Sequence, residues 1–159
     1  MQLNKNISIL FAGRGGEGIL TASFITAHAF FSSGYDVKKS DIKGIARRGG
    51  RVFSTVIAGR KVYNPKIAAD MVDIAVLFSK GHKLLFSENT IIISPTDEEA
   101  EKFSRNLNIF CLGKLSVLLD IPLEIWEQSI KERFDDNTSR LNLSAFYEGK
   151  QVGEITKIS

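Results

Sequence analysis

The part of the chain best suited to bind a ligand is a glycine-rich hexapeptide. It consists of Gly13, Arg14, Gly15, Gly16, Glu17 and Gly18. An apolar run precedes it and an amphipathic segment follows, so the pattern predicts a strand, a glycine turn and the start of a helix. Glycines adopt positive φ and leave backbone N–H groups accessible, and a helix N-terminus favours negative charge. The loop can therefore hold a phosphate, a carboxylate or a partner's acidic group, although close packing alone also explains such turns.

Positive charge is concentrated in one segment. Between Lys38 and Lys66 there are nine Lys or Arg residues against one acid, Asp41. At its centre is a turn with two guanidinium groups and two glycines: Arg47, Arg48, Gly49 and Gly50. The turn is too short for a crossover helix, so we expect antiparallel strands that bring it to the end of the sheet with the glycine loop. Guanidinium groups bind phosphates well, so we expect contact with a partner or a cofactor phosphate; a solvated basic surface is the plainer alternative.

The glycine spacing also satisfies the dinucleotide-binding pattern G-x-G-x-x-G. Asp41 lies 23 residues beyond Gly18, near the end of a predicted strand, where such folds place the acid that binds a ribose. Glu17 argues against this interpretation, because a carboxylate in the first helical turn would occupy the place of the pyrophosphate. A free-standing NAD(P)-binding oxidoreductase of Rossmann type is the alternative function that this pattern leaves open.

The remaining reactive side chains form no catalytic or metal-binding pattern. Cys111 is the only cysteine, which excludes an internal disulfide and a self-contained iron–sulfur cluster. Its apolar neighbours predict a buried, inert thiol. His28 lies in an apolar helical segment and is expected in the core or an interface, whereas His82 follows a strand without a second ligand at metal spacing. We therefore assign no catalytic and no metal-binding residue.

The composition is that of one globular domain. With 159 residues, of which 43% are hydrophobic, we expect a single domain over residues 1–159. No stretch reaches the roughly 20 apolar residues of a membrane span, and the N-terminal residues do not resemble a cleavable signal peptide. We therefore expect a cytoplasmic protein without membrane contact. We do not expect nucleic acid as a partner, because the sequence shows neither an aromatic-rich basic motif nor a helix-turn-helix pattern.

Apolar periodicity predicts the order of strands and helices. Strands are expected at residues 7–11, 35–40, 52–58, 73–78 and 90–94. Helices are expected at residues 19–31, 96–119 with a break, 122–134 and 139–148. The last helix should end at Gly149, and the runs at 73–78 and 90–94 are typical of strands covered on both faces. The order predicts an α/β fold: a three-layer α/β/α sandwich with a Rossmann-like, mostly parallel sheet, a possible antiparallel strand and a helical C-terminal end.

The order and spacing of several motifs resemble the gamma subunit of 2-oxoacid:ferredoxin oxidoreductases. This family includes the pyruvate, 2-oxoglutarate, 2-oxoisovalerate and indolepyruvate enzymes. The motifs that carry the resemblance are residues 13–18, 34–37, 46–50, 69–74 and 121–126, followed by Phe134, Asn142 and Ala145 to Gly149. Together they cover the chain from about Ile7 to Gly149.

The resemblance implies an accessory subunit. In this family the holoenzyme oxidatively decarboxylates a 2-oxoacid on thiamine diphosphate, passes electrons through iron–sulfur clusters to ferredoxin and makes an acyl-CoA. The chain is then expected to bind no cofactor alone and to be inactive in isolation. Its partners would be the alpha and beta subunits, with a ferredoxin-like delta subunit as a further candidate. The motifs at 13–18 and 47–50 would form its active-site or coenzyme A-facing surface.

Two features depart from the family pattern. Glu17 stands where the family usually has glutamine, which places an anion at the start of a helix and leaves anion binding by the loop open. The chain is also shorter than the family pattern between Gly81 and Thr90 and around residues 101–107.

A third function class, a basic nucleic-acid adaptor, would predict salt-dependent DNA or RNA binding through Arg47 and Arg48.

Overall fold

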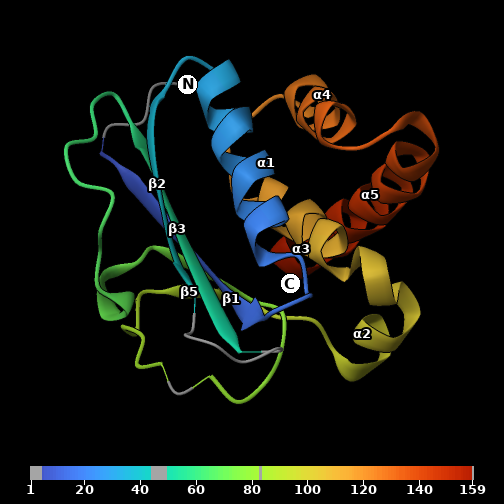
Figure 1. Cartoon of the computed structure of the whole chain (residues 1–159), viewed down its shortest axis with the longest axis horizontal. Helices are drawn as coiled ribbons and strands as arrows, with labels where there is room; N and C mark the ends of the chain where they lie inside the picture. Colours follow the sequence, from blue (N-terminus) through green and yellow to red (C-terminus); the bar gives the residue numbers. More distant parts are fainter. Residues whose placement is uncertain (1–4, 44–49, 83, 159) are drawn as a thin grey trace.

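A mixed five-stranded sheet forms the centre of the molecule (Figure 1). The computed structural model describes residues 5–43, 50–82 and 84–158. The strands, in the spatial order β2-β3-β1-β4-β5, are β1 (Ile7–Arg14), β2 (Asp36–Lys43), β3 (Arg51–Gly59), β4 (Ile74–Leu77) and β5 (Ile91–Ile93). β1, β4 and β5 pair in parallel, whereas β3 is antiparallel to both of its neighbours. The expected antiparallel strand is therefore β3.

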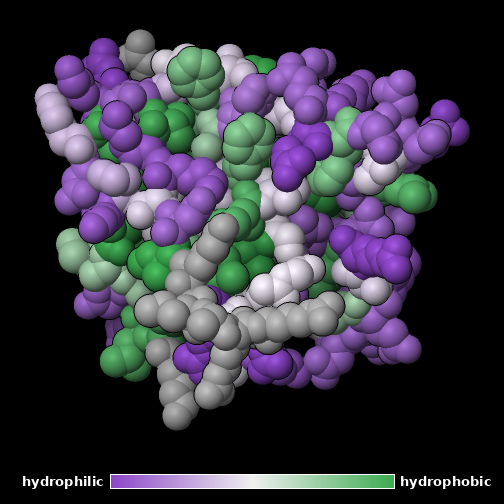
Figure 2. Space-filling model, in the orientation of Figure 1, coloured by the Kyte–Doolittle hydropathy of each residue, from purple (hydrophilic) through white to green (hydrophobic). Residues whose placement is uncertain are grey.

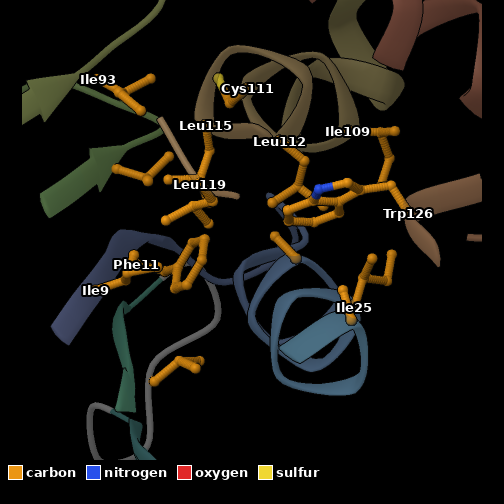
Figure 3. Packing of buried hydrophobic residues seen from close by; sticks show 14 of the residues in the cluster. Ile9, Phe11, Ile25, Ile93, Ile109, Cys111, Leu112, Leu115, Leu119 and Trp126 are labelled. Carbon is orange, nitrogen blue, oxygen red and sulfur yellow. The ribbon is translucent and has the colours of Figure 1, made fainter. Parts of the chain in front are cut away.

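The helices pack against one face of the sheet (Figure 1). They are α1 (Ile19–Ser32), α2 (Asp97–Phe103), α3 (Leu107–Ser116), α4 (Leu123–Arg133) and α5 (Asp136–Ile158), with 3-10 turns η1 (Ala69–Met71) and η2 (Ser104–Asn106). Alternate residues of β1, Ile9 and Phe11, point to this side and meet Leu115 and Leu119 (Figure 3). Trp126 of α4 closes the same core and is almost fully buried. This larger core fixes α1 and the C-terminal helices on the sheet.

Irregular segments cover the other face. A smaller core of Leu10, Val72 and Ala75 lies there, with Leu84 and Phe86 packed against it. The α/β class and the helical C-terminal end are confirmed. The third layer, however, is built by the segments 60–73 and 78–90, in which the described residues contain one 3-10 turn and no α-helix. In this chain the apolar residues of these connections are too irregularly spaced to form amphipathic helices.

β5 is an exposed edge strand. Ile91 and Ile92 are 48% and 51% exposed, because β5 pairs only with β4 and is not covered on both faces. The expectation of a strand covered on both faces is therefore wrong for residues 90–94. It holds for β4, in which Ile74, Ala75 and Val76 are all buried.

α5 does not end at Gly149. The helix continues to Ile158, so the expected C-terminal boundary is wrong. A Cβ atom at Gly149 would lie 1.9 Å from the carbonyl oxygen of Phe110, and one at Gly113 would lie 2.1 Å from that of Phe146. The two glycines thus let α3 and α5 approach backbone to backbone. Gly149 serves helix packing instead of helix termination.

The predicted helix start at Thr96 is confirmed. The Thr96 hydroxyl accepts a hydrogen bond from the Glu99 N–H at 3.1 Å, and the Glu99 carboxylate accepts one from the Thr96 N–H at 3.0 Å. This capping box satisfies two backbone donors at the start of α2. Across the described residues, we find no helix with the length and apolar character needed to cross a membrane.

Candidate functional site

Two loops meet at the carboxyl ends of β1 and β4. The chain leaves β1 towards α1 and β2 on one side of the sheet, while β4 and β5 extend it on the other. In open α/β sheets such a reversal of strand order opens a crevice in which ligands bind. The Phe78 N–H donates a hydrogen bond to the Ala12 carbonyl at 3.0 Å, which holds the loop after β4 beside the loop after β1. The glycine loop therefore stands at the place where this fold forms its ligand site.

The antiparallel strand β3 brings the basic turn to the same edge. Arg14 and Arg51 are direct partners in the β1–β3 register, and the Gly15 N–H donates to the Gly50 carbonyl at 2.8 Å. The pairing direction expected from the short connection is thus confirmed, and Gly50 lies against the glycine loop. Three further predicted site residues lie outside the residues that the structure describes: Arg47, Arg48 and Gly49.

Glu17 closes the glycine loop on itself. The Arg14 N–H donates a hydrogen bond to the Glu17 carboxylate at 3.0 Å, and the Glu17 N–H donates to the Arg14 carbonyl at 3.1 Å. The carboxylate therefore takes up a backbone donor that an anionic ligand would otherwise use. Anion binding at this edge must rely on the neighbouring cations.

The glycines of the loop have different roles. Gly18 has φ +79° at the start of α1, and a Cβ there would lie 2.3 Å from the Asn108 amide nitrogen. A Cβ at Gly13 would lie 2.7 Å from Ile19. Both positions are therefore explained by close packing. Gly15 and Gly16 are exposed, and Gly16 has φ +91° with open space around it, so the accessible part of the loop is its tip.

His82 belongs to this site, although sequence reasoning assigned it no role. Its Nε2 lies 3.0 Å from the Ser79 hydroxyl, and its buried Nδ1 has no hydrogen-bond partner among the described residues. Burial lowers the pKa of His82, and the positive charges of Arg51 and Arg14 lower it further, while Glu17 offsets part of this effect. The imidazole is thus held neutral beside two guanidinium groups. The position after a strand end was its only sequence signal.

Arg51 links the two loops. Its guanidinium Nη2 donates a hydrogen bond to the Gly81 carbonyl at 3.0 Å. An open groove of about 480 Å³ begins beside this contact and runs between the ends of β4 and β5. Its polar lining residues are Arg14, Ser79, Lys80, His82, Ser94, Thr96 and Asp97. A second opening of about 420 Å³ lies over the glycine loop and the start of α1.

The chemistry of this edge is binding and orientation. Guanidinium groups, hydroxyls and a neutral imidazole can hold an anion, and phosphate is the anion whose geometry they match best. Among the described residues, no group of three or more His, Cys, Asp or Glu side chains could hold a metal ion. Cys111 is fully buried in α3, and burial raises the pKa of its thiol to about 12. The predicted burial of Cys111 is confirmed, and its lack of reactivity stays a prediction.

The structure argues against a dinucleotide site. β3 lies between β1 and β2, so Asp41 on β2 is separated from the glycine loop by a whole strand. The Asp41 carboxylate accepts hydrogen bonds from Lys39 Nζ and from the Ser54 hydroxyl, both at 2.5 Å. It is therefore engaged at the outer part of the sheet and not beside Gly13 to Gly18.

His28 has a structural role, as expected. Its Nδ1 lies 2.9 Å from the Ser129 hydroxyl, and its Nε2 lies 3.0 Å from the Glu132 carboxylate. Both partners belong to α4, so His28 ties α1 to α4 at some distance from the glycine loop.

Comparisons with known proteins agree on one family. The model of the family described as pyruvate ferredoxin/flavodoxin oxidoreductase matches residues 8–152. The indolepyruvate oxidoreductase subunit IorB of Thermococcus kodakarensis is 32% identical over 82 residues, which make up 52% of this chain and 41% of that protein. The match thus spans well under half of the relative's length.

Solved structures share the fold over almost the whole chain. The 2-oxoglutarate:ferredoxin oxidoreductase of Magnetococcus marinus, solved with 2-oxoglutarate, coenzyme A and succinyl-CoA bound, matches with a TM-score of 0.79 and 22% identity. That match covers 96% of this chain and 32% of the other. The gamma subunit of a keto/oxoacid ferredoxin oxidoreductase of Geobacter sulfurreducens matches with a TM-score of 0.71 and 21% identity, covering 94% and 99% of the two chains.

Proposed function

Because this chain belongs to the pyruvate ferredoxin/flavodoxin oxidoreductase family, we propose that it serves as a gamma-type subunit of a 2-oxoacid:ferredoxin oxidoreductase complex. The family expected from the sequence motifs is confirmed. The observation that carries the proposal is the family match over residues 8–152, together with a fold shared with a gamma subunit along 94% of the chain. The complex would oxidatively decarboxylate a 2-oxoacid, reduce ferredoxin and release an acyl-CoA.

The catalytic cofactors of such a complex would reside in other subunits. One buried cysteine cannot hold an iron–sulfur cluster, which needs several thiolates. We therefore assign thiamine diphosphate and the clusters to alpha and beta subunits, with a ferredoxin-like delta subunit as a further partner. The complex would work in the cytoplasm.

The edge that carries the glycine loop would face coenzyme A. Coenzyme A carries phosphates, and the guanidinium groups of Arg14 and Arg51, beside the exposed loop tip at Gly16, are hydrogen-bond donors that bind phosphates well. The Nδ1 of His82 supports this assignment. It is buried and has no partner among the described residues, and such an atom gains free energy when a ligand satisfies it. In the complex these residues would bind and orient the phosphates, and Glu17 would hold the loop in shape.

Co-purification tests the proposal. A tagged chain expressed in its native source should bring down subunits that contain thiamine diphosphate and iron–sulfur clusters, identified by mass spectrometry and cofactor analysis. The complex should reduce ferredoxin with a 2-oxoacid and coenzyme A, and the isolated chain should not. Recovery of the chain alone, or micromolar binding of NAD(P) by the isolated chain, would contradict the proposal.

A further inference from the structure

The irregular layer of the molecule presents an unusual surface. Segment 61–71 runs along the outer face of β2 and β3. The Val62 N–H donates to the Asp36 carboxylate at 2.7 Å, Ile67 packs in the smaller core with Phe53, and residues 66–68 line a groove together with Ile42. We call the side chains of Ile42, Lys61, Tyr63, Lys66 and Met71 the basic apolar face.

Large apolar side chains on this face point into solvent. Tyr63 is 84% exposed, Met71 is 69% exposed and Ile42 is 63% exposed. Leu85, on the other irregular segment of the same layer, is 87% exposed. A groove of about 350 Å³ lies between Ile42 and Lys66. An exposed apolar side chain beside a groove, with further exposed apolar side chains on the same layer, is typical of an interaction site.

The charge of the face indicates which partner fits it. Residues 60–71 contain three cations and one acid, and Lys61 lies over the Tyr63 ring with its Nζ 5.6 Å from the ring centroid. Figure 2 shows mainly hydrophilic side chains over α4 and α5, whereas over the sheet hydrophobic side chains lie among charged ones. An apolar patch with an acidic rim would complement the basic apolar face.

We propose that the basic apolar face binds an acidic-rimmed apolar surface on another subunit of the complex; this inference rests on the proposed function. A second copy of the chain does not fit, because it would bring the same cations face to face. The lysines of the open edge of β2, Lys38 and Lys39, likewise disfavour edge-to-edge pairing of two copies. A nucleic acid fits less well, because its phosphate backbone offers nothing to Ile42 and Met71.

Zero-length cross-linking of the purified complex tests the contact. A carbodiimide joins lysine amines to carboxylates within direct reach, so Lys61 or Lys66 should be coupled to Asp or Glu of another subunit. Lys131 on α4 is also exposed and serves as the internal control. Cross-links to another subunit from Lys131 and none from Lys61 or Lys66 would overturn the inference while leaving the proposed function intact.

A pair of matched double variants gives the energetic test. Ile42→Asp with Lys66→Glu alters the face, and Leu141→Asp with Lys131→Glu makes the same changes on the helical side, where Leu141 is 66% exposed. We expect the first variant to weaken assembly with the purified partner subunits about 100-fold and the second less than about threefold. Because both apolar positions are exposed, circular dichroism should show both variants folded.

The outcomes separate the two proposals. If the wild-type chain assembles and the first variant assembles equally well, the inference is overturned and the proposed function stands. If the wild-type chain captures no subunit containing thiamine diphosphate, the proposed function fails and the inference fails with it. RNA binding by the wild-type chain that the first variant loses, with subunit assembly unchanged, also overturns the inference.

Discussion

The backbone N–H of Arg14 donates a hydrogen bond to the carboxylate of Glu17 at 3.0 Å, so the glycine loop carries its own anion. The contact explains how a loop of this shape keeps a negative side chain at the start of α1. It also places a negative charge beside the cations that we propose for phosphate binding. The loop is thereby shaped by Glu17 but weakened as an anion site.

Replacing this charge should strengthen binding of coenzyme A. In Glu17→Gln the amide oxygen can still accept from the Arg14 N–H, while the negative charge is lost. Removing one like charge at a partly exposed site corresponds to about 1 kcal/mol, or roughly a fivefold lower Kd. Isothermal titration of the complex with coenzyme A measures this change. Glu124→Gln on α4 is the control and should leave the Kd unchanged.

His82 should titrate below the ordinary histidine range. Its pKa is lowered from 6.5 by burial and by Arg51 and Arg14, so the folded state favours the neutral ring. The stability that this group contributes is present above about pH 6.5 and is lost as the pH falls towards the folded pKa. NMR titration of the ring protons of His82 measures the pKa directly.

Removing a neighbouring cation should reverse part of that shift. We expect Arg51→Gln to raise the pKa of His82, because one of the charges that oppose protonation is gone. A bound phosphate should act in the same direction. A His82 pKa that does not respond to either change would show that the two guanidinium groups do not govern this site.

The close approach of α3 and α5 should not tolerate a side chain at Gly149. A Cβ there would lie 1.9 Å from the Phe110 carbonyl oxygen, so Gly149→Ala must push two helix backbones apart. We expect a loss of about 3 kcal/mol or more in the free energy of unfolding, measured by urea denaturation. Ser144→Ala, at an exposed position of α5, should change it by less than about 0.5 kcal/mol.

The Cys111 thiol should be unreactive in the folded chain. It is fully buried and its pKa is raised to about 12, so almost no thiolate is present at neutral pH. Modification by a chromogenic disulfide reagent should therefore follow global unfolding in a urea series. Rapid modification of the folded chain would contradict the burial of Cys111 in α3.

The sequence allowed the strand order along the chain and most helix positions to be predicted, because apolar spacing reports directly on burial. The direction of β3 was also predictable, since a turn of a few residues cannot cross over to a parallel strand. The end of α5 was not. Position 149 is a glycine because a side chain there would collide with Phe110 on another helix, and local sequence does not reveal that contact.

The candidate site was predictable only in part. The tip of the glycine loop and its meeting with Gly50 followed from the pattern and the pairing direction. The role of Glu17 as an internal hydrogen-bond acceptor did not, because it depends on the loop's three-dimensional path. The environment of His82 depends on Arg51, which is 31 positions away in the chain, so only the folded structure brings them together.

The proposal that the glycine-loop edge faces coenzyme A is tested most directly by the KM for coenzyme A in a complex containing Arg14→Gln. Loss of one charge-assisted hydrogen bond corresponds to about a tenfold rise in this KM, with the KM for the 2-oxoacid unchanged. Arg140→Gln, an exposed position on α5, is the matched control and should change neither constant. A KM for coenzyme A that stays at the wild-type value in Arg14→Gln would contradict the account.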